Sequence, residues 1–285
     1  MADQPRRLPA AGNTHPDVQR FFQLKRRASP YPSGLTLEGL WQVQHALLAS
    51  LQFEVIFLCP GLLRGDEARR LCLRLRAAGV PVLAVSERLL CRMVDRDGPD
   101  GIAAIAQPRP HHLADLDLNQ HGRLLIADAI DLPGNLGTLI RCADGAGATA
   151  VIVSEPRIRI HHPTVVRASM ATVLTMPVIA TDRFTVIDWL RQRHVRIIAA
   201  DPASPLHYRA ADYTGRVAIV VGSERTGLAT AWRKAADVMV SIPMTGIADS
   251  LNVGHAAALL MYEALHDTLP PHGTETQQPP SGATT

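Results

Sequence analysis

The chain contains little cysteine, and none of it is arranged for a metal or a disulfide framework. No two cysteines form a Cys-x-x-Cys pair, and no histidine stands at ligand spacing beside one, which argues against a structural zinc site. The paired histidines at 111–112 and 161–162 are sequence neighbours whose side chains point apart, so we expect no metal site there. The cysteines therefore indicate buried thiols in a reducing compartment, at Cys59, Cys72, Cys91 and Cys142.

Long apolar runs are also missing. No stretch reaches the roughly 18–20 apolar residues that cross a bilayer. The segment 1–7 is polar with no apolar core after it, so no secretory signal is expected. Together these features predict a cytoplasmic protein, and its 285 residues with 47% hydrophobic content suffice for one large domain or two ordinary ones.

The usual phosphate-binding signatures are absent as well. The chain has no Gly-x-Gly-x-x-Gly after a predicted strand and no Gly-Lys-Ser/Thr, the glycine-rich loops that cradle dinucleotides and nucleoside triphosphates. Enzymes that depend on ATP or NAD through those loops are therefore disfavoured, although ATP or NAD binding would reopen that class.

Charge is weakly positive overall but unevenly distributed. The net charge is +3; residues 1–110 contribute +5 and the remainder −2. The N-terminal part is thus the better candidate for meeting a polyanion. Its densest basic run, which we interpret as a contact to RNA, could equally be a solvated helix face; it consists of Arg20, Lys25, Arg26 and Arg27.

The first of two expected domains is a small α/β unit over residues 18–108. A flexible polar segment, 1–17, precedes it. Apolar spacing and glycine stops indicate alternating elements. We expect helices at 18–28, 37–51, 66–78 and 87–94, and strands at 55–58, 80–85 and 102–106.

The second expected domain covers residues 121–268, after a proline-rich linker at 109–120 and before a flexible tail at 269–285. Its strands are rich in Val and Ile and alternate with helices, which predicts a mostly parallel sheet covered on both faces. We expect strands at 123–128, 150–153, 178–180, 195–200, 217–221 and 237–242, and helices at 135–146, 163–174, 184–192 and 251–266.

Three loops of this second domain join a predicted strand to a glycine-containing turn and a helix: 131–141, 221–228 and 242–253. Backbone N–H groups at such helix starts can bind an anion, and glycine allows a ligand to approach the backbone closely. Apolar residues Ile242 and Met244 suit an adenine ring. Each loop alone is also a common βα turn, and Ser250 could be only a helix N-cap.

Taken in order, the three loops closely resemble the SpoU/TrmH branch of the SPOUT RNA methyltransferases. The first motif is Asn135-Leu-Gly137 with Arg141 after it. The second is Gly222-Ser-Glu224-Arg-Thr-Gly227-Leu228. The third is Ile242-Pro-Met244 followed by Ser250-Leu-Asn252-Val253, with Tyr262-Glu263 in the closing helix. The match spans 123–266, about half the chain.

The resemblance implies more than the spacing does. It implies a Rossmann-like sheet whose C-terminal segment forms a trefoil knot, which is rare among folds, together with a homodimer and S-adenosylmethionine as cofactor. It implies methyl transfer to a ribose 2′-hydroxyl of structured RNA. The residues expected around the reacting hydroxyl are Arg141, Asn135, Glu224, Ser250 and Asn252. Those expected to bind the cofactor are Gly222, Leu228, Ile242, Met244 and Leu251.

One departure stands in the third motif, where the family often has Asn-Val-Ser and this chain has Asn252-Val253-Gly254-His255. Glycine near a helix start costs roughly 1 kcal/mol relative to alanine. We expect His255 to pack against its neighbours rather than to reach the site.

The N-terminal unit resembles, more weakly, the small substrate-recognition domain that several SpoU enzymes carry. The residues that match best are Glu38-Gly39 and Asp100-Gly-Ile-Ala-Ala104. Ribosomal RNA is the expected substrate, because a structured target needs an extra domain. Transfer RNA is the alternative, as is a non-catalytic RNA-binding assembly factor on the same scaffold. Of Phe21 and Phe22, one could stack on an unpaired base, while core packing is expected for at least one ring.

Overall fold

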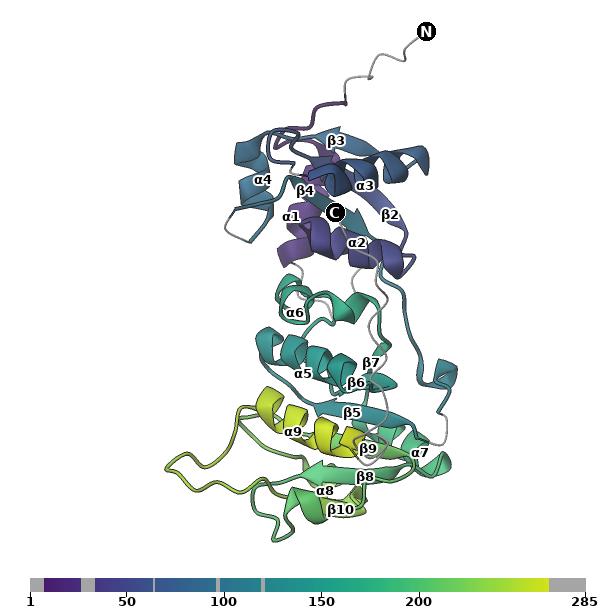
Figure 1. Cartoon of the computed structure of the whole chain (residues 1–285), viewed down its shortest axis with the longest axis vertical. Helices are drawn as coiled ribbons and strands as arrows, with labels where there is room; N and C mark the ends of the chain where they lie inside the picture. The colour runs from purple at the N-terminus through teal and green to yellow at the C-terminus, as the bar shows by residue number, and fades with distance from the viewer. Residues whose placement is uncertain (1–7, 27–33, 64, 96–97, 119–120, 267–285) are drawn as a thin grey trace, which may run out of the picture.

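The computed structural model describes residues 8–26, 34–63, 65–95, 98–118 and 121–266. It consists of two lobes stacked along the long axis of the molecule, each built around its own sheet (Figure 1). We call them the N-terminal lobe (residues 8–106) and the second lobe (residues 121–266). The predicted flexible tail at 269–285 lies outside the described residues, as do 1–7 of the predicted N-terminal segment.

The N-terminal lobe is a four-stranded mixed sheet in the order β1-β4-β2-β3. Only β2 and β3 run parallel, because the chain crosses through a helix between them, whereas β4 is antiparallel to both β1 and β2. The elements are α1 (Pro16–Arg26), β1 (Leu35–Glu38), α2 (Leu40–Leu48), β2 (Phe53–Leu58), α3 (Gly65–Ala77), β3 (Val82–Ala84), α4 (Glu87–Met93) and β4 (Ile102–Ala106).

The expected helix at 37–51 is wrong at its beginning. Residues 35–38 instead form β1, which pairs with β4 through Leu37 opposite Ala104. Gly39 turns the chain between the strand and the helix. Its φ of 91° is a backbone conformation that residues with side chains rarely adopt. The apolar spacing corresponds to a helix only from Leu40 onward. The four residues of the preceding strand are too few to show the alternating pattern of a strand.

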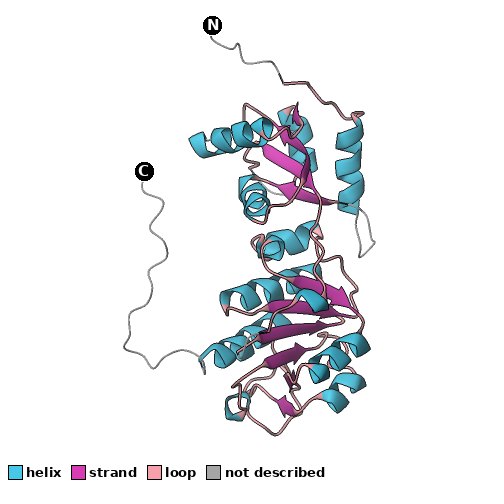
Figure 2. Cartoon of the chain, turned by 90° about the vertical axis from the view of Figure 1, so that its right-hand side faces the viewer, coloured by secondary structure: helices cyan, strands magenta, loops and turns pink. Residues whose placement is uncertain are grey.

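The second lobe is a six-stranded sheet in the order β10-β8-β9-β5-β6-β7, with every strand pair parallel, as predicted. Figure 2 shows helices on both faces of it. Its elements are η1 (Leu113–Asp115, before the sheet), β5 (Arg123–Asp128), α5 (Pro133–Gly145), β6 (Ala150–Ser154), α6 (Pro163–Ala168), η2 (Thr172–Leu174), β7 (Val178–Thr181), α7 (Arg183–Gln192), β8 (Arg196–Ala200), η3 (Tyr208–Ala210), β9 (Val217–Val221), α8 (Thr230–Ala235), β10 (Val238–Val240) and α9 (Val253–His266).

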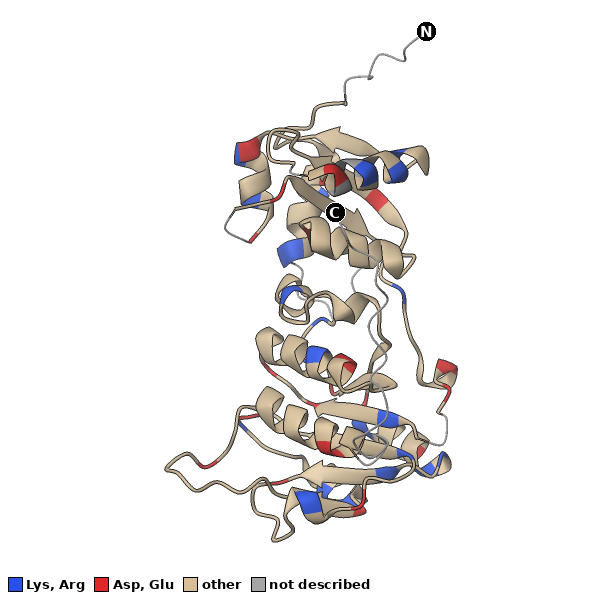
Figure 3. Cartoon of the chain, in the orientation of Figure 1, with Lys and Arg blue, Asp and Glu red and all other residues tan. Residues whose placement is uncertain are grey.

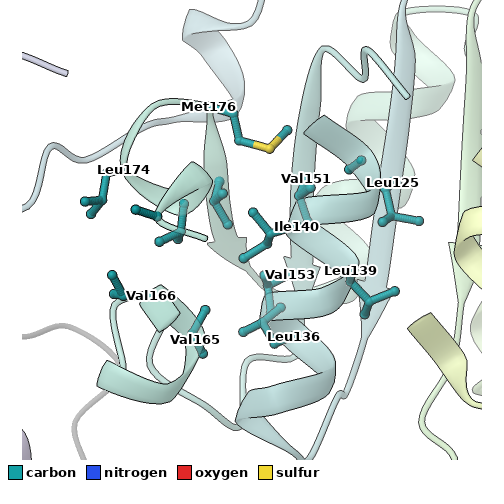
Figure 4. Close-up of a cluster of buried hydrophobic side chains, with 14 of the residues drawn as sticks. Leu125, Leu136, Leu139, Ile140, Val151, Val153, Val165, Val166, Leu174 and Met176 are labelled. Atoms are coloured by element: carbon teal, nitrogen blue, oxygen red, sulfur yellow. The ribbon is translucent and has the colours of Figure 1, made fainter. Parts of the chain in front are cut away.

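Alternate residues of the central strand β5 enter two different cores. Leu125 and Ala127 face α5, α6 and α9, whereas Leu124 and Ile126 face α7 and α8. The first core is drawn in Figure 4, where side chains of α5 interleave with those of β6, α6 and η2. A parallel sheet buried on both faces reads as a continuous apolar run, which is why its strands were predictable from Val and Ile content.

Two helices differ from expectation. The predicted helix at 163–174 ends at Ala168, because Met170 and Ala171 adopt positive φ values of 54° and 67° before the short η2. The helix α8 was not predicted; it has only 6 residues and one large buried side chain, Trp232. So short an element carries too little periodicity to be recognised.

Hydrogen bonds join the two lobes. The Arg159 guanidinium, 4% exposed, donates to the carbonyl of Leu24 at the end of α1 over 2.7 Å. The Trp41 indole N–H donates to the Met170 carbonyl over 2.9 Å.

The threading of the C-terminal segment through a knot stays a prediction. None of the helices in the described ranges has the length and apolar character that crossing a membrane requires.

Candidate functional site

A cleft opens at the carboxyl ends of β8, β9 and β10, where parallel sheets of this kind bind their ligands. The loop that leads into α9 forms one wall and projects from the lobe (Figure 1). The loop after β9 forms the opposite wall. All five residues predicted to bind a cofactor line this cleft: Gly222, Leu228, Ile242, Met244 and Leu251.

Gly222 lies where the backbone crowds most. A Cβ atom there would come within 2.4 Å of the Gly227 carbonyl oxygen. The loop closes on itself through a hydrogen bond of 2.8 Å from the Gly227 N–H to the Ser223 carbonyl, with Gly227 at φ 63°. At Gly222 the wall of the cleft is therefore main chain, which lets a flat ligand approach the backbone closely there.

Three predicted catalytic residues meet at the rim of the cleft. The Asn252 amide donates to Glu224 Oε1 over 2.6 Å and to Asn135 Oδ1 over 3.2 Å. The Val253 N–H also donates to Glu224 Oε1, over 3.2 Å. These residues come from three different loops, so this cluster joins segments far apart in the sequence. The carboxylate also sits at the start of α9, where the helix dipole favours negative charge.

Asn252, and not Ser250, is the N-cap of α9. The Gly254 N–H donates to Asn252 Oδ1 over 2.9 Å, and the Ala256 N–H to the Asn252 carbonyl over 3.0 Å. Ser250 lies two residues before the cap, lines the cleft and is exposed, with its hydroxyl donating to Asp249. The capping alternative for Ser250 is wrong, and its hydroxyl remains available to a ligand.

Asp131 connects the first loop to the second. One carboxylate oxygen accepts from the Arg157 guanidinium over 2.6 Å and the other from the Ser223 hydroxyl over 2.9 Å. These hydrogen bonds, that of Arg157 foremost, lower the pKa of Asp131. Asp131 thereby holds the two loops in register close to the cluster of Asn135, Glu224 and Asn252.

Arg141 is not in the cleft. It lies six residues after Asn135 on α5, a rise of about 9 Å, and is exposed on a neighbouring groove together with Thr138 and Tyr262. Among the described residues, no hydrogen bond or ion pair engages its guanidinium. The loops that meet also do not follow three adjacent strands, because β8 separates β9 from β10. The structure thus joins three of the five predicted catalytic residues by hydrogen bonds, places Ser250 in the lining of the cleft and leaves Arg141 alongside.

The basic run of α1 is largely engaged within the N-terminal lobe. Lys25, whose side chain is 12% exposed, pairs with Glu38 and Asp95 and donates to the Met93 carbonyl. Arg20 forms a two-pronged ion pair with Glu54, which raises the pKa of the guanidinium. These two contacts argue against the predicted RNA role of Lys25 and Arg20. Figure 3 shows acidic and basic positions interspersed along both lobes.

Of the other predicted RNA contacts, Arg26 is exposed and Arg27 lies outside the described residues. Phe21 is fully buried, and Phe22 packs edge-on against it beneath Arg92. The core-packing alternative is confirmed for Phe21. A count of charges along the sequence could not reveal the acidic partners, because these come from β1, β2 and the end of α4.

Three residues of the site differ from expectation. Asp201, 4% exposed, follows β8 and pairs with Arg233 at the cleft wall. Neither was predicted, although a carboxylate directly after a strand was a usable signal.

His255 is exposed, so its predicted packing is wrong. It neighbours Gly254, where a Cβ atom would approach the Thr138 methyl to 2.6 Å, so glycine allows α9 to pack against α5.

Comparison with known proteins assigns the chain to a family. Residues 122–262 match the model of the SpoU rRNA methylase family, and residues 36–111 match the model for RNA 2′-O ribose methyltransferase substrate binding. The chain belongs to the SpoU rRNA methylase family, which confirms the resemblance read from the three loops.

Individual relatives agree in both sequence and fold. The chain is 32% identical over 231 residues, 78% of this chain and 95% of the relative, to the 23S rRNA (guanosine-2′-O-)-methyltransferase RlmB of Pectobacterium atrosepticum. It is 35% identical over 196 residues, 66% of this chain and 78% of the relative, to the RlmB of Ralstonia nicotianae. It resembles the AdoMet-bound rRNA methyltransferase of Sinorhizobium meliloti with a TM-score of 0.83 and 27% identity, covering 92% of this chain and 98% of the other.

Proposed function

We propose that this protein transfers a methyl group from S-adenosylmethionine to a ribose 2′-hydroxyl of ribosomal RNA. The observation that carries the proposal is the hydrogen-bonded cluster of Asn135, Glu224 and Asn252 at the rim of the cleft. Both the cleft and the cluster lie within the residues that match the family model. A relative that the chain covers almost completely is named as an RNA 2′-O-methyltransferase.

The cleft fits the cofactor. Ile242, Leu228 and Leu251 offer apolar surface to an adenine ring, and the main-chain wall at Gly222 offers backbone groups to its edge. Met244 extends the apolar surface. When bound, S-adenosylmethionine supplies an electrophilic methyl group on a sulfonium. The Glu224 carboxylate complements that positive charge, whereas the Asp201 carboxylate is already paired with Arg233.

The chain's own residues contribute mainly by positioning. Holding a poor nucleophile in line with the methyl donor can be worth effective molarities of about 10⁵ M or more. Asn252 has both of its polar atoms engaged, which fixes its side chain and, through it, Glu224 at the cleft rim. The exposed Ser250 hydroxyl lines the cleft and can accept a hydrogen bond from the sugar while it donates to Asp249. These residues would hold the ribose hydroxyl in line with the methyl group; as the methyl–sulfur bond breaks, the sulfonium would leave as the neutral thioether and the hydroxyl proton would pass to water.

Arg141 acts as a phosphate clamp in this proposal. A guanidinium is effectively always protonated in proteins, so it is a poor base. It lies exposed beside the cleft, which suits binding of the target's phosphate and stabilisation of the developing alkoxide. Its position outside the cofactor cleft accords with a partner on the RNA and not on the cofactor.

Ribosomal RNA is preferred over transfer RNA because the N-terminal lobe matches the substrate-binding model and the relatives of similar length are named for 23S rRNA. The division at 109–120 follows the boundary between the two matched regions. We further propose a cytoplasmic homodimer. Leu259 of α9 is 41% exposed, apolar surface outside the groove of Arg141 that a second copy would cover.

Two measurements test the proposal. Calorimetry with S-adenosylmethionine should show binding at one site per chain, abolished in Gly222→Ala. Mapping 2′-O-methyl positions in total RNA, with and without the gene, should reveal one ribosomal position that depends on it. A protein that ignores the cofactor would be a non-catalytic assembly factor. A lost mark on transfer RNA alone would establish the other substrate class.

A further inference from the structure

A groove of about 710 Å³ runs between the two lobes, separate from the cofactor cleft. Trp41 and His45 of α2 line one side. The other side is formed by residues of α5, α6, η2 and α9 and of the turn after α6, among them Arg141, Asp144, Met170 and Tyr262. Arg141 is the one residue of this groove that the proposed function already uses.

Trp41 presents its ring to this groove in a fixed orientation. The residue is 50% exposed, unusually so for an indole. Its N–H donates to the Met170 carbonyl of the other lobe over 2.9 Å, and the His45 ring packs on it at 4.2 Å between centroids. His45 is held in turn by a 2.8 Å hydrogen bond between its Nδ1 and the Trp41 carbonyl. An exposed aromatic ring anchored at its edge and supported from behind leaves one face for a ligand.

The Met170 carbonyl is available only because the backbone bends there. Met170 and Ala171 both have positive φ, 54° and 67°, conformations that cost free energy for residues other than glycine. The bend ends α6 and turns that carbonyl toward the indole. Two consecutive unfavourable conformations thus support the placement of one exposed side chain.

The groove chemistry identifies the ligand class. It combines a π-face, the Arg141 cation, the exposed Asp144 carboxylate and the Tyr262 ring. Single-stranded RNA is bound by such a combination, with unpaired bases stacked on aromatic rings, a phosphate on Arg, and base-edge N–H groups donating to polar acceptors. A purely apolar peptide would leave the two charges uncompensated.

We infer that Trp41 is the stacking platform for an unpaired base next to the methylated nucleotide, whose phosphate lies on Arg141. This inference rests on the proposed function and names the RNA surface that serves it. The N-terminal lobe then contributes to recognition through α2, at the junction of the lobes, and not through the basic run of α1.

The test compares Trp41→Ala with Trp41→Phe, which keeps a ring but loses the indole N–H. Phe184→Ala is the matched control, since it removes an exposed ring that does not line the groove. The substrate is unmodified 23S ribosomal RNA transcribed in vitro. We expect Trp41→Ala to raise KM for RNA about tenfold. Trp41→Phe should stay within about threefold, with cofactor affinity and kcat at saturating RNA close to those of the intact protein.

Four outcomes would overturn the inference. The first is an unchanged KM for RNA in Trp41→Ala, and the second is a rise of KM in Trp41→Phe as large as in Trp41→Ala. The third is an equal rise of KM in Phe184→Ala, and the fourth is a changed oligomeric state of Trp41→Ala in sedimentation with an unaltered KM. The third would indicate a general effect of removing a ring, and the last would assign the groove to a second copy of the chain. An intact protein that methylates no RNA would defeat the proposed function instead. As a second readout, an unstructured RNA oligonucleotide should quench tryptophan fluorescence in the intact protein and markedly less in Trp41→Phe.

Discussion

The two lobes use their polar side chains in opposite ways. In the N-terminal lobe, Lys25 is enclosed by Glu38 and Asp95, so its charge stabilises the lobe itself. In the second lobe, Asn252 reaches Asn135 across 117 positions of sequence, and the cluster they form stays exposed at the cleft. The comparison teaches that clustered charge in a sequence is weak evidence of a binding surface. Polar residues after several parallel strands are stronger evidence, because the fold brings those positions together.

The largest effect expected concerns Arg141. Arg141→Ala should lower kcat by about 10²–10³-fold, because it removes the cation that binds the reacting phosphate and stabilises the developing charge on the oxygen. Cofactor affinity should stay within twofold, since Arg141 does not line the cleft. Methyl transfer to RNA and calorimetry are the measurements, with Arg193→Ala as a control that removes an arginine packed on Trp189. Wild-type turnover in Arg141→Ala would end the clamp assignment.

Lys25 provides the sharpest test of the comparison itself. Lys25→Met should lower the free energy of unfolding by about 3 kcal/mol, because it leaves the buried Glu38 carboxylate without its ion pair. Arg26→Met, at the adjacent exposed position, should change it by less than about 0.5 kcal/mol. Chemical denaturation of both variants decides the matter. Should Lys25→Met unfold like the intact protein yet bind RNA poorly, the basic run would be a binding surface after all.

Gly254→Ser tests the contact between α5 and α9. The added Cβ would meet the Thr138 methyl at 2.6 Å, and overpacking of this kind costs about 1–3 kcal/mol. Thr138→Ser removes that methyl and should recover part of the loss in the double variant. A double-mutant cycle by thermal unfolding measures the coupling. Additive effects would show that the two residues do not press on each other.

The smallest effect is a dependence of stability on pH. Desolvation, with His111 and Arg159 nearby, lowers the pKa of His161 from 6.5 to about 4. The unfolded chain therefore binds a proton at higher pH than the folded one, and stability falls as pH decreases through 6.5 toward 4. Between pH 7 and pH 6 the loss should be about 0.7 kcal/mol. His161→Asn should flatten this part of the profile; an unchanged slope would exclude His161 as its source.

The sequence predicts the second lobe far better than the first. Its strands are buried on both faces and appear as runs of Val and Ile, as in β9, and its loops carry motifs specific enough to name a family. The short β1 and α8 were missed because neither is long enough to display a period. The break in the helix after Ala168 was missed because Met170 and Ala171 carry no sequence signal for positive φ.

Within the site, the sequence predicted which residues take part, but not the direction in which the Arg141 side chain points. Asn135, Glu224 and Asn252 were identified from motifs and do meet. Arg141 belongs to the same motif but turns to a different groove, since six residues along a helix rotate a side chain well away from the first. The partners of Lys25 come from β1 and the end of α4, and only the folded lobe brings them to α1.

The crowding at Gly222 has a consequence for inhibition. Where an enzyme binds its cofactor through side chains, a single substitution can replace one contact by another. Such a substitution can weaken the binding of a competing drug while the cofactor still binds. Here the cleft wall at Gly222 is peptide backbone with no room for even a methyl group. Point mutations cannot readily alter that surface without losing the natural cofactor too, so a compound that hydrogen-bonds to it would leave few routes to resistance.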